Sequence, residues 1–179
     1  MNKKDKIAVF GLGYVGLPLA IAFSEYYSVV GFDPNLDRIN SLNQSVDTNG
    51  DIIFKKNDNV FFTNDYLQIK QANIYIITVP TPVSSNNTPD LSIMKSATKM
   101  VASLLKKNDI VIYESTVYPG VTEDICVPIL EIESNLKYNL DFYCGYSPER
   151  ISPGPGKYTL KNVVKVTSGS NDETANKVD

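Results

Sequence analysis

The chain has no histidine among its 179 residues and only two cysteines, Cys126 and Cys144. Without histidine it cannot build a histidine-based catalytic triad, a histidine zinc site or the histidine base of lactate-type dehydrogenases. Two cysteines make neither a disulfide framework nor a metal site. We therefore expect both to be small buried hydrophobic side chains, and we expect no metal centre.

Positive charge is in slight deficit, because the formal net charge is -3 and the sequence pI is about 5.0. This balance predicts no basic face for nucleic acid, and Lys3, Lys4 and Lys6 are interpreted as a solvated N-terminal edge. No segment approaches the roughly 20 apolar residues of a membrane span. The early apolar stretch could be a secretory signal, but glycines and Pro18 interrupt it and no small-residue cleavage site follows. We expect a cytoplasmic protein.

Residues 6–33, KIAVFGLGYVGLPLAIAFSEYYSVVGFD, hold the most informative pattern. An apolar run precedes G-x-G-x-x-G, a periodic segment follows to about residue 25, and a second apolar run ends on Asp33. In a dinucleotide site Gly11 permits the tight turn, Gly13 lets the backbone approach the pyrophosphate, and Gly16 lets helix and strand pack closely. The helix N-terminus favours the anion. Asp33 is placed to bind the adenosine ribose and repel a 2′-phosphate, which predicts NAD rather than NADP.

Apolar runs alternate with helical segments, which is typical of a Rossmann-type doubly wound α/β fold, with a mostly parallel sheet and helices on both faces. We expect strands at residues 7–10, 29–32, 60–63, 73–79, 109–114, 141–145 and 163–167. Helices are expected at residues 34–42 with Pro34 first, 66–71, 92–105 with Ser92 as cap, and 123–129, ending near Pro128. Residues 45–59 should be a loop with a short helix, and residues 84–90 a surface loop.

Three further segments follow expected strands, at the edge where open α/β sheets bind ligands. They read VPTPV (residues 79–83), ESTVYPG (residues 114–120) and GYSPERISPG (residues 145–154). Together with FGLGYVGLPLA and GFDPNLDRI, they resemble the N-terminal NAD-binding domain of the UDP-glucose/GDP-mannose dehydrogenase family over essentially the whole chain. The YSPER form most resembles the branch that oxidises UDP-N-acetylhexosamines.

The resemblance implies an NAD-dependent oxidoreductase that converts the C6 alcohol of a UDP-sugar to a carboxylate and passes two hydrides to two NAD molecules. A cysteine elsewhere in such enzymes carries a thiohemiacetal and a thioester, and the products feed capsule, O-antigen or related polysaccharides. Residues 1–179 would be a single NAD-binding domain, a fragment without the central helix and sugar-nucleotide domain. The full-length protein would be a homodimer or larger. The fragment is expected to bind NAD without turning over UDP-sugars.

Several cofactor contacts carry over by resemblance. Tyr14 and Val15 match residues along the pyrophosphate, Asp33 and Arg38 match the pair that flanks the adenosine, and Thr81 matches a threonine that contacts NAD. Arg38 could instead be a solvated helix charge, and Thr81 a plain turn threonine.

Glu149 is the best catalytic candidate, because the matching glutamate acts with a water in hydrolysing the thioester, and burial can raise a carboxyl pKa towards that of a base. Thr116 resembles a threonine that positions the nicotinamide side of the site and holds a water. Arg150 and Ile151 match positions that touch the sugar nucleotide. The alternatives are a surface Glu149 paired with Arg150, and a Thr116 that caps a helix.

Two features depart from the family pattern. The loop after Ile151 reads PGPGK (residues 153–157), where the family commonly has an acid and a lysine after Pro-Gly. The nucleophilic cysteine is missing, since neither Cys126 nor Cys144 has a G-x-C-x-P-K-D setting. Two other interpretations stay open: a domain of a 6-phosphogluconate or 3-hydroxyacyl type dehydrogenase, and a non-catalytic NAD-sensing module.

Overall fold

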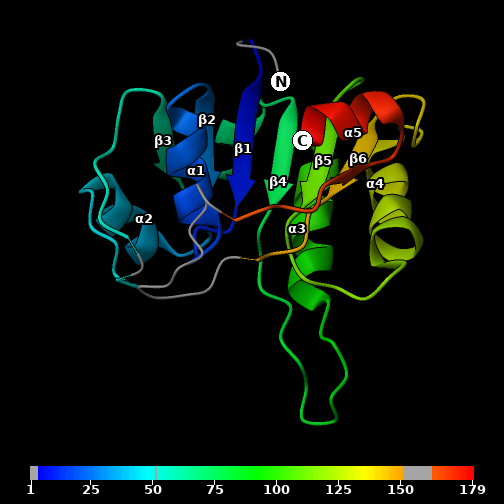
Figure 1. Ribbon diagram of the computed structural model, residues 1–179, viewed down its shortest axis with the longest axis horizontal. Coiled ribbons are helices and arrows are strands. Elements are labelled where there is room, and N and C mark those ends of the chain that lie inside the picture. The colour runs from blue at the N-terminus through cyan, green and yellow to red at the C-terminus, as the bar shows by residue number, and fades with distance from the viewer. Residues whose placement is uncertain (1–3, 51, 151–162) are drawn as a thin grey trace.

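A computed structural model describes residues 4–50, 52–150 and 163–179. Its centre is a seven-stranded sheet in the order β3-β2-β1-β4-β5-β6-β7 (Figure 1). All neighbouring strands are parallel except β6 and β7, which are antiparallel. The strands are β1 (Lys6–Phe10), β2 (Ser28–Phe32), β3 (Val60–Thr63), β4 (Ile74–Ile77), β5 (Ile110–Tyr113), β6 (Tyr143–Tyr146) and β7 (Ser168–Gly169).

The strand order reverses at the centre of the sheet. From β1 the chain runs outward through β2 and β3, then crosses back to place β4 on the other side of β1. Open α/β sheets bind ligands in the crevice outside the carboxyl ends of the strands at such a reversal. The arrangement confirms the expected Rossmann-type doubly wound fold.

The central strands are apolar along their whole length because helices cover both faces. Every residue of β4 and β5 is buried, as expected for strands in the interior of a parallel sheet. β1 is buried from its second residue onward. The continuous apolar runs of the sequence therefore marked these strands correctly.

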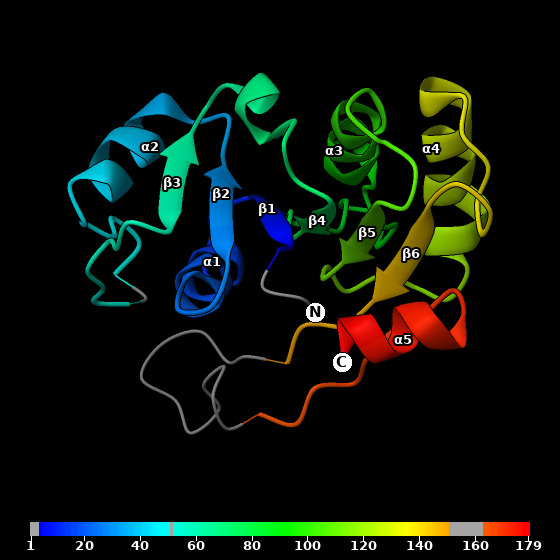
Figure 2. The ribbon, with the colours of Figure 1, turned by 90° about the horizontal axis from the view of Figure 1, so that it is seen from above.

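Helices cover the two faces of the sheet with separate cores. Figure 2 shows α3 (Ser92–Ala102) and α4 (Val127–Ser134) on one face, and α1 (Gly16–Ser24) and α5 (Asp172–Val178) on the other. The 3-10 helix η1 (Tyr66–Ile69) adds Ile69 to the α3 core, and α2 (Leu36–Asn43) adds Ile39 and Leu42 to the α1 core. Among the described residues, no helix combines the length and hydrophobicity that crossing a membrane requires.

Two helices begin differently from expectation. Pro34 precedes α2 rather than opening it, because the Asn35 side chain caps the helix by accepting from the amides of Asp37 (3.0 Å) and Arg38 (3.1 Å). Ser92 is the first residue of α3 rather than its cap, and its amide donates to the Asp90 carboxylate at 2.8 Å. α3 ends at Ala102, earlier than expected.

Pro128 begins a helix instead of ending one. A π-helical segment, η2 (Val121–Cys126), leads directly into α4, and Pro128 lies in the first turn of α4. Proline is tolerated there because the first-turn amides of a helix have no intrahelical acceptor. α4 then runs to Ser134 and ends at Asn135, which takes the left-handed conformation common at helix C-termini.

The last strand is also displaced. Residues 163–167 are not a strand, and the strand that pairs with β6 is Ser168–Gly169. Val164 and Val166 are exposed, so the apolar residues that suggested a buried strand face solvent. In the expected loop of residues 45–59, the described residues form turns, without the short helix.

Candidate functional site

The glycine-rich turn lies between β1 and α1, at the carboxyl edge of the sheet. Gly11 has φ +89°, a conformation that favours glycine, and its amide donates to the Phe32 carbonyl at 2.9 Å. A Cβ on Gly16 would lie 1.8 Å from the Gly11 carbonyl oxygen and 2.4 Å from the Thr78 hydroxyl. Gly16 is therefore required for α1 to approach the turn.

Gly13 faces space instead of protein. A Cβ built there meets no described atom within 4 Å. Gly13, Tyr14 and Val15 line a cavity of about 520 Å³, and among the described residues no side chain caps the N-terminus of α1. Uncapped first-turn amides and the positive end of the helix dipole suit a bound phosphate.

Asp33 follows β2 and joins three cavities. Its carboxylate accepts from the Leu12 amide at 2.9 Å and from the Asn35 amide at 3.0 Å. It lines the cavity over Gly13, a second of about 520 Å³ and a third of about 450 Å³. An ionised carboxylate has about four acceptor sites, so capacity is left for ribose hydroxyls.

The second cavity is an apolar slot beside Asp33. Its walls come from the ends of β1, β2 and β4 and from one stripe of α3, with the residues Phe10, Phe32, Val79, Ile93, Ala97 and Met100. A flat aromatic base suits such a slot. The sequence analysis did not assign the α3 residues to the site, although positions 93, 96, 97 and 100 follow the spacing of one helix face.

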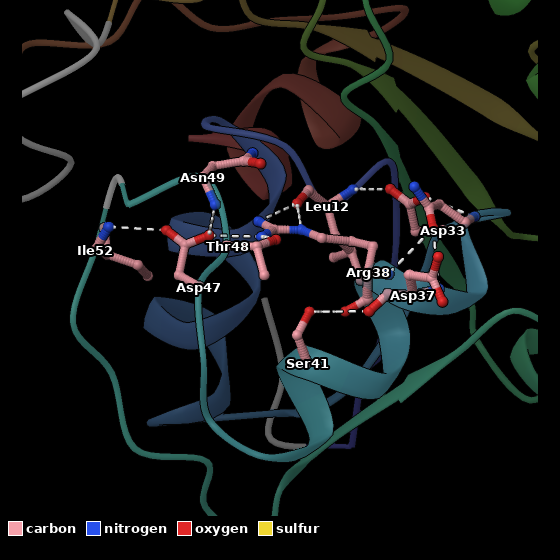
Figure 3. Close-up of polar contacts among 10 residues, drawn as sticks. Leu12, Asp33, Asp37, Arg38, Ser41, Asp47, Thr48, Asn49 and Ile52 are labelled. Atoms are coloured by element: carbon pink, nitrogen blue, oxygen red, sulfur yellow. Dashed lines mark hydrogen bonds and ion pairs between the residues drawn. The ribbon is translucent and has the colours of Figure 1, made fainter.

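Arg38 is buried, with 7% of its surface exposed, so it is not a solvated helix charge. Its Nε and Nη2 donate to the Leu12 carbonyl at 3.0 and 2.7 Å (Figure 3). Its Nη1 donates to Asp47 at 2.6 Å and to Thr48 at 3.2 Å. Arg38 lines the third cavity together with Asp33. Its direct contact with a cofactor stays a prediction.

Thr81 and Thr116 meet at the far end of the cavity over Gly13. The Thr81 hydroxyl donates to the Thr116 carbonyl at 2.8 Å and so connects the loops after β4 and β5. The buried Ser115 hydroxyl makes a second connection, to the Val79 carbonyl at 2.6 Å. Both threonines line the cavity, and their contacts with NAD stay predictions.

Glu149 lies after β6 and lines the same cavity as Thr116. One carboxylate oxygen accepts from the Arg150 amide at 2.6 Å. Of the predicted sugar-nucleotide residues, Arg150 has an exposed side chain. Ile151 lies outside the described residues, as does the loop of residues 153–157. Their roles stay predictions.

Glu114 is a further acid in this cavity, which the sequence analysis noted only as part of a motif. It is buried and forms an ion pair with Lys165. Burial raises the pKa of Glu114, the Lys165 ammonium opposes that rise, and the negative charge of Glu149 adds to it. The cavity therefore holds two neighbouring carboxylates, those of Glu114 and Glu149.

Comparison with known proteins identifies the family of the chain. Residues 5–178 match the model of the UDP-glucose/GDP-mannose dehydrogenase family, NAD binding domain. The chain belongs to this family. It is 48% identical over 180 residues to a UDP-N-acetyl-D-glucosamine 6-dehydrogenase from Pseudomonas aeruginosa, covering 99% of this chain and 43% of the relative. It is 49% identical over 177 residues to a UDP-N-acetyl-D-glucosamine 6-dehydrogenase from Salmonella typhi, covering 97% of this chain and 42% of the relative.

Solved structures of the UDP-glucose/GDP-mannose dehydrogenase family share the fold. A UDP-D-ManNAc dehydrogenase from Pyrococcus horikoshii superposes with a TM-score of 0.84 at 35% identity, covering 96% of this chain and 43% of that one. The chain thus spans less than half the length of the relatives it matches. The family match supports neither the 6-phosphogluconate or 3-hydroxyacyl type dehydrogenase nor the NAD-sensing module.

The chain is the NAD-binding domain of this family, and its three cavities, which share Asp33, fit the parts of NAD. The apolar slot suits adenine, Asp33 the adenosine ribose, the open space at Gly13 the pyrophosphate, and the threonine end the nicotinamide. The open cradle at Gly13 fits the cofactor, because a methyl group there would occupy the space that the phosphates need.

The two cysteines take no part in this site. Cys126 and Cys144 are both buried, and burial raises the pKa of both thiols. A thiol with a raised pKa gives little thiolate and is a poor nucleophile. Among the described residues, no group of histidine, cysteine, aspartate or glutamate side chains could hold a metal ion.

Proposed function

We propose that this chain is the NAD-binding domain of an enzyme that oxidises the C6 alcohol of a UDP-sugar, a UDP-N-acetylhexosamine, to a uronic acid. The single observation that carries the proposal is the alignment of Gly13, Asp33, Thr116 and Glu149 around joined cavities at the carboxyl edge of the sheet. Identities of 48% and 49% to UDP-N-acetyl-D-glucosamine 6-dehydrogenases support this choice of sugar.

The NAD held here would supply the acceptor for one hydride from C6 in each of two oxidations, first of the alcohol and then of the thiohemiacetal, with the first NADH exchanged for a second NAD in between. This domain holds the cofactor through the glycine-rich turn and Asp33. The hydrogen bond from Thr81 to Thr116 fixes the two loops beside the nicotinamide end, so that substrate and cofactor meet in one orientation.

Glu149 would act in the last step of the reaction. A cysteine in the part of the enzyme beyond this chain would hold the thioester, and a water held near Thr116 would attack its carbonyl carbon. Glu149 would take a proton from that water, the C–S bond would break, and the proton would pass to the cysteine sulfur as the carboxylate product is released. The position of Glu149 in the same cavity as Thr116 supports this assignment.

Other properties of the whole enzyme are also proposed. We infer that residues 1–179 are one domain of a longer chain, because relatives are more than twice this length. We further propose a dimer or larger assembly of the full-length protein, a cytoplasmic location and a role in polysaccharide biosynthesis. Reading the gene beyond codon 179 for a cysteine in a G-x-C-x-P-K-D context tests the first of these.

The cofactor site is tested by calorimetric titration with NAD, and with NADP for comparison. NAD should bind and NADP should bind much more weakly, since a 2′-phosphate would approach the Asp33 carboxylate. Asp33→Ala should weaken NAD binding about tenfold or more, because hydrogen bonds to a charged group contribute about 1.5 to 3 kcal/mol. Equal binding of NAD and NADP by the wild-type chain would contradict this assignment of Asp33.

The catalytic proposal is tested with UDP-N-acetylglucosamine. The 179-residue chain should bind NAD and yet give no steady formation of NADH, whereas the full-length enzyme should form it. In the full-length enzyme, Glu149→Gln should slow thioester hydrolysis by about 100-fold or more while NAD binding is retained. Steady turnover by the 179-residue chain alone would overturn the requirement for a cysteine outside it.

A further inference from the structure

Arg38 lines the third cavity and forms an ion pair with Asp47, a residue of the loop after α2. The Asp47 side chain is 1% exposed and the Arg38 side chain 7%, and the two approach to 2.6 Å. Figure 3 shows the guanidinium lying between Asp47 and Thr48 on one side and Leu12 on the other. The pair therefore connects the loop after α2 to the glycine-rich turn.

In the proposed NAD site Asp33 binds the adenosine ribose, so a 2′-phosphate on that ribose would lie close to Asp33 and to the third cavity. Asp33 lines it together with Gly13, Asp37 and Arg38. In dinucleotide-binding folds an acid at the end of the second strand hydrogen-bonds the ribose 2′-hydroxyl, and a nearby arginine can accommodate a 2′-phosphate. An arginine in this position would by itself favour NADP.

The contacts of Arg38 leave it little capacity for a phosphate. Nε and Nη2 share the Leu12 carbonyl, and Nη1 is divided between Asp47 and Thr48. Four of its hydrogen bonds are thus made within the protein, and a guanidinium has five N–H donors. Asp47 also balances its positive charge at short range.

We propose that Asp47 determines cofactor specificity: by holding and neutralising Arg38, it prevents this arginine from binding a 2′-phosphate. The proposal rests on the NAD site described above and assigns a role to a residue outside the family motifs of the sequence. Asp33 and Asp37 add negative charge at the same cavity, so Asp47 supplies part of the exclusion rather than all of it.

Asp47 is itself held in place. Its carboxylate accepts from the amides of Asn49 at 3.2 Å and Ile52 at 3.0 Å, and its carbonyl accepts from Gly50 at 3.0 Å. Aspartate in the first position and glycine in the fourth are typical of a type I turn. Moving Arg38 towards a phosphate would leave a buried carboxylate without its cation, which is strongly unfavourable.

The test measures the dissociation constants of NAD and NADP for the 179-residue chain and its variants. Asp47→Asn keeps the shape of the side chain and removes its charge. We expect its preference for NAD over NADP to fall about tenfold, the size expected when one charge is removed a few ångströms from a phosphate in a water-like medium. Asp47→Ser is the second variant should the first not fold, since serine also suits the first turn position.

Two controls separate charge from structure. Asp47→Glu keeps the charge but alters the turn, and should keep the wild-type preference. Asp58→Asn makes the same change of net charge at an exposed position before β3, and should leave both constants unchanged.

The outcomes distinguish this proposal from the NAD site on which it rests. If the wild-type chain does not bind NAD, the cofactor site itself is wrong. If it binds NAD and the neutral Asp47 variants weaken NAD and NADP equally, Asp47 is only structural and the proposal fails. An unchanged preference in folded Asp47→Asn or Asp47→Ser overturns it as well.

Discussion

At the scale of single residues, Gly13 and Gly16 are three positions apart and serve different ends. A methyl group on Gly16 would meet the backbone of Gly11, which cannot yield cheaply, whereas one on Gly13 would point into open space. Gly16 is therefore required for packing, and we propose that Gly13 leaves room for the cofactor. The G-x-G-x-x-G motif names both without distinguishing them.

The two alanine variants should separate these roles. Gly16→Ala should lower the free energy of unfolding by about 3 kcal/mol or more, because the added carbon overpacks against backbone. Gly13→Ala should leave stability unchanged or raise it by about 0.4 to 1 kcal/mol, since alanine reduces the entropy of the unfolded chain. Denaturant titration measures both.

NAD binding should be weakened by Gly13→Ala, the variant that is expected to keep its stability. Folded Gly13→Ala should bind NAD at least about tenfold more weakly, because its methyl group takes the space of the pyrophosphate. Normal NAD affinity in Gly13→Ala would show that the cofactor follows another path.

Arg38 shows which contacts of a single residue can be predicted from the sequence and which cannot. Its pairing with Asp33 was expected from the resemblance to the family, and the structure puts both residues on one cavity. Its partner Asp47 could not be predicted, because it comes from a loop without hydrophobic periodicity. Long-range partners of a charged side chain are set by tertiary packing, which short motifs do not encode.

At the scale of elements, strands were predictable wherever burial was complete. β1, β4 and β5 appear as unbroken apolar runs because both of their faces are covered. Pro128 was misjudged because proline is read as a terminator, whereas the same residue suits a first turn. β7 was misplaced because its two residues pair through backbone at an edge, which leaves little trace in hydrophobicity.

Asp47, in the turn at residues 47–50, should make the stability of the fold depend on pH in the acid range. Burial alone would raise the pKa of Asp47, but hydrogen bonds from Ile52 and Arg38 and the charge of Arg38 lower this pKa below its usual range. A depressed folded-state pKa stabilises the protein above the unfolded value, and that stabilisation is lost as pH falls through the folded value.

The free energy of unfolding, measured by denaturant titration, should therefore fall as the pH drops below about 4. This loss should be smaller in Asp47→Asn than in the wild type, since asparagine has no proton to take up. The Asp58→Asn variant serves as the matched comparison. If Asp47→Asn loses as much stability as the wild type over this interval, the ion pair contributes nothing to folding.

At the scale of the whole molecule, the strand order brings the binding residues together. Gly13, Asp33, Thr81, Thr116 and Glu149 follow five different strands, and they share one cavity because those strands are parallel and end at the same edge. The alternation of strands and helices made this architecture predictable. The cavity dimensions and the α3 wall of the apolar slot were not, because side-chain packing sets them.

NAD should stabilise the whole domain. At about 100 times its dissociation constant, a ligand that binds only the folded state adds about 2.7 kcal/mol. For a domain of this size that corresponds to a rise in Tm of about 5 to 10 °C. Differential scanning fluorimetry with and without NAD measures it, with Gly13→Ala at the same NAD concentration as the control. A similar rise in Gly13→Ala would point to binding elsewhere.

The contacts of Thr78 mean that the glycine-rich turn can pack fully only after a much later part of the chain has been synthesised. Its hydroxyl lies 2.8 Å from the Phe10 carbonyl oxygen and 2.7 Å from that of Gly11, across 68 and 67 residues of sequence. Although the glycine-rich turn is among the first segments made, its packing is incomplete until β4 has left the ribosome and docked beside β1. A nascent chain shorter than this therefore lacks the assembled pocket, and NAD can assist folding only after β4 is in place.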